Sequence, residues 1–129
     1  MIEYTVKVYD NGTRHWYLNG ELHREDGPAI EYASGDKYWW LNGKPHREDG
    51  PAIEWADGDK EWYLEGKRHR KDGPAKEWAD GTKSWWLNGK QMTEKEHAEA
   101  TSKVQEMTME EVCEALGKNI KIKSKEYDN

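Results

Sequence analysis

Two consecutive stretches, LHREDGPAIEYASGDKYWWLNGK at residues 22–44 and PHREDGPAIEWADGDKEWYLEGK at residues 45–67, are nearly the same sequence. The spacing of His23, His46 and His69 gives a period of 23 residues. A partial unit near the N-terminus, VYDNGTRHWYLNG, enters the same frame, so the chain holds about three and a half units. A fixed period of this length is typical of a repeat array, in which equivalent residues form columns across neighbouring units.

The composition limits the chain to one domain, or to a small domain with an appendage. It has 129 residues, a formal net charge of −6 and 34% hydrophobic residues, with eight Trp and seven Tyr. Aromatic side chains bury a large area per residue, which offsets the low apolar content. Because neither the repeats nor the remainder is basic, nucleic acid and anionic membranes are not expected partners.

The single cysteine, Cys113, has no partner within the chain for a disulfide. The sequence also has neither a signal peptide nor an apolar stretch of membrane-spanning length. Together these features predict a cytoplasmic location.

Each unit has the pattern of β-strands joined by tight turns. Runs such as AIEYA and KYWWL, with β-branched and aromatic residues, alternate with Asn-Gly, Asp-Gly, Ser-Gly and Glu-Gly pairs. Such pairs supply the positive φ angles of hairpin turns, and Gly-Pro begins the next strand. We therefore expect a mostly β fold over residues 1–91, an antiparallel sheet of repeated hairpins in a meander or solenoid.

The turn of each hairpin decides which side chains share a face. If residues 34–35 form a two-residue turn, Ile30 lies opposite Trp39, and Tyr32 and Leu41 share their face. We take this face and its equivalents as the core. Its expected residues are Ile30, Tyr32, Trp39, Leu41, Ile53, Trp55, Trp62, Leu64, Trp78, Trp85 and Leu87.

The opposite face is expected to carry an aromatic column beside an acidic column. A sheet with aromatic residues on both faces is either covered on both or presents one of them to a partner. The C-terminal helices or a second copy of the chain would serve as the cover. The candidate partner-binding residues on this face are Tyr17, Trp40, Tyr63, Trp86, Tyr38, Glu31, Glu54 and Glu77.

The repeated His-Arg-Glu-Asp segments contain residue types that also build metal sites and acid-base centres. A catalytic or metal site gathers different residues at one point, whereas a repeat distributes identical copies along an array. We expect His46 to be partly buried on the Trp39 side and hydrogen-bonded to a turn. Partner contact is a secondary role for Arg24, Arg47, Arg70, Asp26, Asp49 and Asp72. We expect no enzymatic activity, metal or cofactor.

After Lys90 the repeat stops, and residues 92–129 have a different composition. Thr93 and Thr108 are each followed three residues later by Glu, the capping-box pattern that begins a helix. Two short helices and a last strand, NIKIK, are therefore expected. Since a repeat array needs a cap at its end, the helices are predicted to cover the last hairpin, with partner binding or dimerisation as the alternative.

The segment WLNGKPHREDGPAIEWADGDKEWYLEGK resembles the MORN repeat, and more closely its bacterial and phage variants with HREDGPA-type units. The shared marks are Asn-Gly-Lys, His46 three residues after Gly43, and Ala-Asp-Gly at residues 56–58 followed by an aromatic residue. The likeness covers roughly residues 4–90 and implies a curved single sheet used as a binding scaffold. Typical MORN units have Gly directly after the His, so lipid association is not carried over.

An aromatic and acidic sheet face predicts a non-enzymatic module that binds a protein partner. Some MORN-like relatives are described as antitoxins, so the resemblance narrows this to a phage or bacterial inhibitor that blocks a host defence or toxin protein. One alternative is a ligand binder that holds a sugar, a nucleotide or a cationic group between stacked Trp and Tyr. Another is a self-assembling structural protein, or a homodimer, that pairs through open strand edges.

Overall fold

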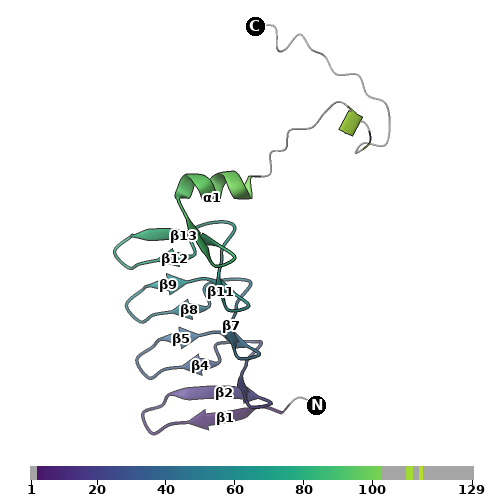
Figure 1. The fold of residues 1–129 in the computed structure, drawn as a ribbon. Helices are drawn as coiled ribbons and strands as arrows, with labels where there is room; N and C mark the ends of the chain where they lie inside the picture. The colour runs from purple at the N-terminus through teal and green to yellow at the C-terminus, as the bar shows by residue number, and fades with distance from the viewer. Residues whose placement is uncertain (1–2, 103–109, 112–113, 115–129) are drawn as a thin grey trace.

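Glycine-containing turns divide the chain into two-stranded units that stack in one direction, as Figure 1 shows. The structure, a computed structural model, describes residues 3–102, 110–111 and 114. Its main sheet follows the order β1-β2-β4-β5-β8-β9-β12-β13-β14, with β3 also paired to β2. The pairings are antiparallel. The predicted mostly β meander with a small C-terminal helical cap is confirmed.

The strands are short, and the units 22–44 and 45–67 each contribute one hairpin to the main sheet and one beside it. In the unit 68–90 the second hairpin, formed by β13 and β14, belongs to the main sheet. The main sheet contains β1 (Thr5–Val8), β2 (Arg14–Leu18), β3 (Glu21–Leu22), β4 (Ile30–Glu31), β5 (Lys37–Tyr38), β8 (Ile53–Glu54), β9 (Lys60–Glu61), β12 (Lys76–Glu77), β13 (Lys83–Leu87) and β14 (Lys90–Met92). The side hairpins are β6 (Trp40–Leu41) with β7 (Lys44–Pro45), and β10 (Tyr63–Leu64) with β11 (Lys67–Arg68). They lie along one side of the stack (Figure 1).

The side hairpins have the turns that their sequences predict. Asn42 and Gly43 have φ angles of 51° and 75°. Positive φ at both central residues is the signature of the two-residue turn that Asn-Gly favours. Positive φ recurs at the equivalent positions Asn19, Glu65 and Asn88.

The main-sheet hairpins have a longer loop than predicted. The Tyr32 backbone N–H donates to the Asp36 carbonyl at 3.0 Å, and the Gly35 N–H donates to the Tyr32 carbonyl at 2.9 Å. Three residues, 33–35, therefore form the loop, and Gly35 has a φ of 99°. This is the three-residue hairpin whose last position is left-handed and favours glycine.

The extra loop residue changes the register. Ile30 pairs with Tyr38, and Glu31 pairs with Lys37. The predicted pairing of Ile30 with Trp39 was wrong by one residue. Because side chains alternate between the two faces, this slip moves the second strand's residues to the faces opposite to those predicted.

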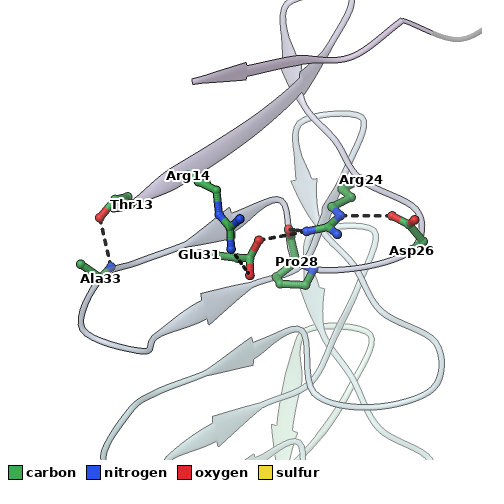
Figure 2. A network of polar contacts seen from close by, with 7 residues as sticks. All are labelled: Thr13, Arg14, Arg24, Asp26, Pro28, Glu31 and Ala33. Carbon is green, nitrogen blue, oxygen red and sulfur yellow. Dashed lines mark hydrogen bonds and ion pairs between the residues drawn. The ribbon is translucent and has the colours of Figure 1, made fainter. Parts of the chain in front are cut away.

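Side-chain hydrogen bonds join each loop to the loop of the next unit. Thr13 Oγ1 accepts from the Ala33 N–H at 3.0 Å, as Figure 2 shows. Asp36 Oδ1 accepts from the Ala56 N–H at 2.6 Å. The same bond recurs between Asp59 and Ala79 at 2.7 Å, so the loop tips are linked along the stack.

The core is thin because the stack is essentially one layer of sheet. Ala29, Ala52 and Ala75 are completely buried and Ile30 is nearly so, while none of the large side chains in the described part is fully buried. The other expected core residues are only half-buried. The buried line of the stack is therefore formed by small alanines between aromatic residues.

Helix α1 (Glu94–Thr101) lies at the C-terminal end of the stack (Figure 1) and contacts β13. The predicted capping box is present, since Thr93 Oγ1 accepts from the Glu96 N–H and Glu96 Oε1 accepts from the Thr93 N–H. His97 is buried, and its Nε2 lies 2.6 Å from the Arg70 carbonyl oxygen.

The second predicted helix falls mostly outside the described residues, although Glu110, Glu111 and Glu114 are helical. The predicted strand NIKIK lies wholly outside them. None of the helices in the described part has the length and apolar character needed to cross a bilayer.

Candidate functional site

One face of the main sheet carries a row of alternating charges, and we name it the ladder face. The paired residues across the strands are, in order, Arg14, Glu31, Lys37, Glu54, Lys60, Glu77 and Lys83. Opposite charges directly across two strands contribute roughly 0.2–1 kcal/mol per pair. Arg14 and Glu31 form an ion pair at 3.4 Å, and the other pairs of the row place opposite charges on adjacent strands, which favours the observed register.

Each complete unit also places an arginine over a tryptophan on the ladder face. The Arg47 guanidinium carbon lies 3.8 Å from the centre of the Trp39 ring. Arg47 Nε donates to Asp49 Oδ1 at 3.0 Å, and Nη1 donates to Glu54 Oε1 at 2.7 Å. The equivalent sets are Trp16 with Arg24, Asp26 and Glu31, and Trp62 with Arg70, Asp72 and Glu77.

Figure 2 shows the polar contacts of Arg24, which reaches from Asp26 to Glu31. Its Nη1 donates to the Pro28 carbonyl at 3.3 Å and to Glu31 Oε1 at 3.0 Å. Glu31 also accepts from Arg14 at 3.4 Å. The acidic column predicted for a partner, Glu31, Glu54 and Glu77, is thus paired with arginines of its own chain.

The glycine of each His-Arg-Glu-Asp-Gly segment makes room for this arginine. A Cβ added at Gly50 would lie 2.9 Å from Arg47 Cζ. The corresponding approach is 2.8 Å at Gly27 and 2.9 Å at Gly73. The motif is therefore a compact corner in which a glycine backbone borders a guanidinium group.

The histidines of these corners bond to the side-hairpin turn that follows them in the chain. His46 Nδ1 accepts a hydrogen bond from the Glu65 N–H at 2.9 Å, in the turn between β10 and β11. His23 and His69 accept from Asn42 and Asn88 in the same way. The expectation of a partly buried imidazole bonded to a turn is confirmed. A neutral ring that accepts at Nδ1 carries its proton on Nε2.

The other face of the sheet, which we name the variable face, holds the columns that change between units. Three of these columns are His15, Tyr38, Glu61 and Ser84; Ile30, Ile53 and Lys76; and Tyr32, Trp55 and Trp78. The predicted aromatic column of Tyr17, Trp40, Tyr63 and Trp86 lies here as well, with Tyr38. Placing it on one face with the Glu31 column was wrong, because the longer loop separates the two columns.

A band of aromatic rings crosses the N-terminal half of the variable face. Tyr32 meets Tyr38 at 5.1 Å between ring centres, and Tyr38 meets Trp55 at 5.4 Å, both edge to face. His15 continues the band towards Tyr9, 5.0 Å away. Edge-to-face pairs are worth about 0.5–1.5 kcal/mol beyond the area they bury. The band is therefore pre-arranged as a firm apolar surface.

A buried carboxylate interrupts this band in the unit of residues 45–67. Glu61 is 5% exposed and accepts from Trp55 Nε1 at 3.0 Å, Tyr63 Oη at 3.0 Å and Arg68 Nη2 at 2.6 Å. Burial raises the pKa of Glu61, but these three donors outweigh it and hold the pKa below its ordinary value. Arg68 also lies over the Trp86 ring, 4.7 Å from its centre.

Sequence reasoning did not identify Glu61 or Arg68 as members of the face. The sequence could have indicated them because each differs in residue type from its equivalent one period earlier. Glu61 corresponds to Tyr38, and Arg68 corresponds to Pro45. Burial raises the pKa of the Tyr63 hydroxyl, and the neighbouring Glu61 carboxylate adds to this. The unit of residues 45–67 therefore differs from the other units in charge as well as shape.

Two grooves lie away from the aromatic column. One has a volume of about 680 Å³, between two successive corners, and is lined by Arg47, Glu48, Asp49, Gly50, Trp62, Leu64, His69, Arg70, Lys71 and Asp72. The other, of about 520 Å³, is lined by Glu21, Leu41, Asn42, Lys44, His46, Glu48 and Glu65. Neither of these grooves includes Trp40 or Trp86, the pair expected to line a ligand pocket.

Within the part of the chain that the structure describes, no three His, Cys, Asp or Glu residues gather to hold a metal ion. Comparisons with protein-family models, curated proteins and solved structures found no match to the chain.

Proposed function

We propose that this protein is a non-enzymatic module that binds a protein partner through its variable face. The observation that supports this is the distribution of differences among the complete units, 22–44, 45–67 and 68–90. The residue type changes from unit to unit at the strand positions equivalent to Leu22, Ile30, Tyr38 and Trp40, which all lie on the variable face. It also changes at the neighbouring position of Tyr32. The ladder-face positions of Glu31, Lys37 and Trp39 do not change.

A scaffold needs the same contacts in each unit, so columns that pack neighbouring units together stay constant. Columns that vary in chemistry while remaining in the sheet are available for recognition of a partner. Seven of the fifteen residues at these five positions are Tyr or Trp, and another is Arg68. These three residue types are enriched in the hot spots of protein interfaces.

A ligand binder is less well supported, because the two grooves exclude Trp40 and Trp86. Half-buried rings spread over several strands suit a broad protein surface better than a small molecule. The narrower role of a phage or bacterial inhibitor, or antitoxin, that blocks a host defence or toxin protein rests on the resemblance to MORN-like proteins.

The test is a tagged pull-down from bacterial lysate with mass spectrometry, followed by titration calorimetry with the captured protein. The Trp40→Ala, Trp86→Ala double variant is expected to lose most of the binding, at least about tenfold, since truncated hot spots cost roughly 2 kcal/mol or more. The matched control is Lys37→Ala, Lys83→Ala on the ladder face. Circular dichroism verifies that both variants are folded.

Binding that survives the tryptophan variant and is lost in the lysine variant would assign recognition to the ladder face. A parent protein that captures no partner from any relevant lysate would contradict the proposal and leave the ligand-binding alternative to be screened.

A further inference from the structure

The two ends of the stack differ in how their last strand is covered. The inner strands β4, β8 and β12 are paired on both sides, whereas among the described residues β1 pairs with β2 alone. At the other end, α1 contacts β13. Glu99 and Ala100, one period after Lys76 and Glu77, lie in this helix instead of forming a further strand. Among the described residues, α1 therefore covers the last stacked hairpin at one end, where β14 forms a side hairpin with β13, and β1 pairs with β2 alone at the other.

The backbone groups at the open edge belong to Val6 and Val8. In an antiparallel sheet, alternate residues of a strand bond to alternate neighbours. The Tyr9 N–H donates to the Thr13 carbonyl at 2.8 Å. The backbone N–H and C=O groups of Lys7 and Thr5, two and four residues earlier, therefore also point towards β2. Val6 and Val8 consequently direct their N–H and C=O groups towards the open edge.

The side chains of these two residues are also unusual for an open edge. Val6 is 38% exposed and Val8 is 67% exposed. Val8 stands one period before Glu31, in a column that is otherwise Glu. Natural sheets usually protect open edges with charged residues, and here the charge is replaced by an apolar group on the ladder face. Tyr4, whose ring meets Trp16 edge to face, extends this apolar strip.

We propose that β1 pairs antiparallel with β1 of a second copy and forms a two-fold symmetric dimer. Outward-directed residues must face each other, which leaves few registers. With Val6 opposite Val6, the partner of Val8 is Tyr4 and the partner of Thr5 is Lys7. A shift by two residues in one direction would place Lys7 opposite Lys7, and directly opposed like charges are destabilising. The opposite shift would set Thr5 opposite Thr5 and leave Val8 opposite residue 2, outside β1.

A second copy fits this edge better than an unrelated strand, because the sequence Tyr4 to Val8 is complementary to itself in this register. Helix α1 blocks head-to-tail growth, so the association closes at two copies. The dimer joins two main sheets into one and places two variable faces on a continuous surface. This inference does not depend on the proposed binding function.

Sedimentation equilibrium of the full chain, from low micromolar to millimolar concentration, tests the proposal. The expected result is a reversible change from the 15.1 kDa monomer to twice that mass. Val6→Pro removes an outward N–H that β2 does not use, and prolines are tolerated at such edge positions. It is expected to abolish the dimer while the circular dichroism spectrum is retained. Val6→Lys is a second edge variant, and Ser34→Lys is a matched control on an exposed loop.

The register is tested with a short bis-maleimide crosslinker in a Cys113→Ser background. Val6→Cys is expected to yield a covalent dimer, and Ser34→Cys is not. A monomer at all concentrations, a dimer that persists in both edge variants, or growth beyond two copies would each overturn the proposal. Efficient crosslinking at Ser34→Cys in place of Val6→Cys would overturn it as well.

Discussion

Arg47 covers the Trp39 ring, with its guanidinium carbon 3.8 Å from the ring centre. Both side chains are half-buried, and the same arrangement recurs one period earlier and one period later. In a single-layer sheet without a deep core, such stacked pairs replace the second layer that would otherwise exclude water from the tryptophans. This relationship should therefore contribute strongly to stability.

Replacing Arg47 by Met is expected to lower the free energy of unfolding by about 2–4 kcal/mol. The variant loses a cation–π contact worth roughly 0.5–2 kcal/mol and charged hydrogen bonds worth roughly 1.5–3 kcal/mol. Urea unfolding followed by tryptophan fluorescence measures the change. Lys44→Met, at an exposed cation, is the control and should cost less than about 0.5 kcal/mol. Similar losses in the two variants would contradict the role given to the stacked pair.

Gly50→Ala is expected to destabilise the protein by about 1–3 kcal/mol, as overpacking does. The new Cβ would lie 2.9 Å from Arg47 Cζ and displace the guanidinium group. Gly50 is not among the glycines with positive φ, so the alanine backbone is not strained there. The loss should therefore largely disappear in an Arg47→Met background, as a double-mutant cycle of urea unfolding would reveal. An equal loss in both backgrounds would assign the glycine to another cause.

Glu61→Gln is expected to cost about 1–3 kcal/mol of unfolding free energy, because Arg68 loses its charged partner in a half-buried site. The Glu61→Gln, Arg68→Met double variant should lose less unfolding free energy than the two single variants lose in sum. The double variant removes both charges, whereas each single variant leaves one charge without its partner. Chemical denaturation of the four proteins measures this coupling. Glu21→Gln, at an exposed carboxylate, serves as the control. Additive losses would show that the two side chains act independently.

Burial, together with the nearby Lys71 and His97, lowers the pKa of His69. The unfolded chain, with an ordinary histidine pKa of about 6.5, then takes up a proton before the folded chain does. The free energy of unfolding should consequently be greatest above about pH 6.5 and fall as the pH decreases through the lowered pKa of folded His69. Urea unfolding across this range, with NMR titration of the imidazole, measures both quantities.

Two variants isolate the contribution of His69 to this pH dependence. His69→Gln removes the titrating group and should reduce the fall in stability. Lys71→Glu restores the carboxylate found at Glu25 and Glu48, which lie 3.6 and 3.7 Å from the histidines of their own units. It should raise the pKa of His69 and also reduce the fall. An unchanged pH profile in both variants would exclude His69 as its origin.

Local chemistry explains why parts of the fold were predictable. The Asn42-Gly43 turn and the Thr93 capping box each depend on a few adjacent residues, and the structure has both. The mostly β meander also followed from strand-like runs separated by such turns. His46 was correctly expected to bond a turn, because the strand alternation set by the preceding turn placed it, partly buried, on the Trp39 side.

The candidate site was only partly predictable. Trp40 and Tyr38 were correctly placed together, but Glu31 was expected beside them as a partner-binding carboxylate. Its arginine partners could not be recognised from sequence spacing, because the contact depends on a corner that folds Arg24 back over Trp16. The Glu61 cluster joins residues from two strands and a side hairpin, so no single stretch of sequence contains it.

By itself, the sequence determined the 23-residue period, the turns of the side hairpins, the start of α1 and the columns that form the stack. The tertiary structure decided which columns share a face. The physical reason is the two-residue alternation of a strand, by which one additional residue in the loop at Gly35 carries a whole column to the other side of the sheet. That residue separates the paired Glu31 column from the aromatic face.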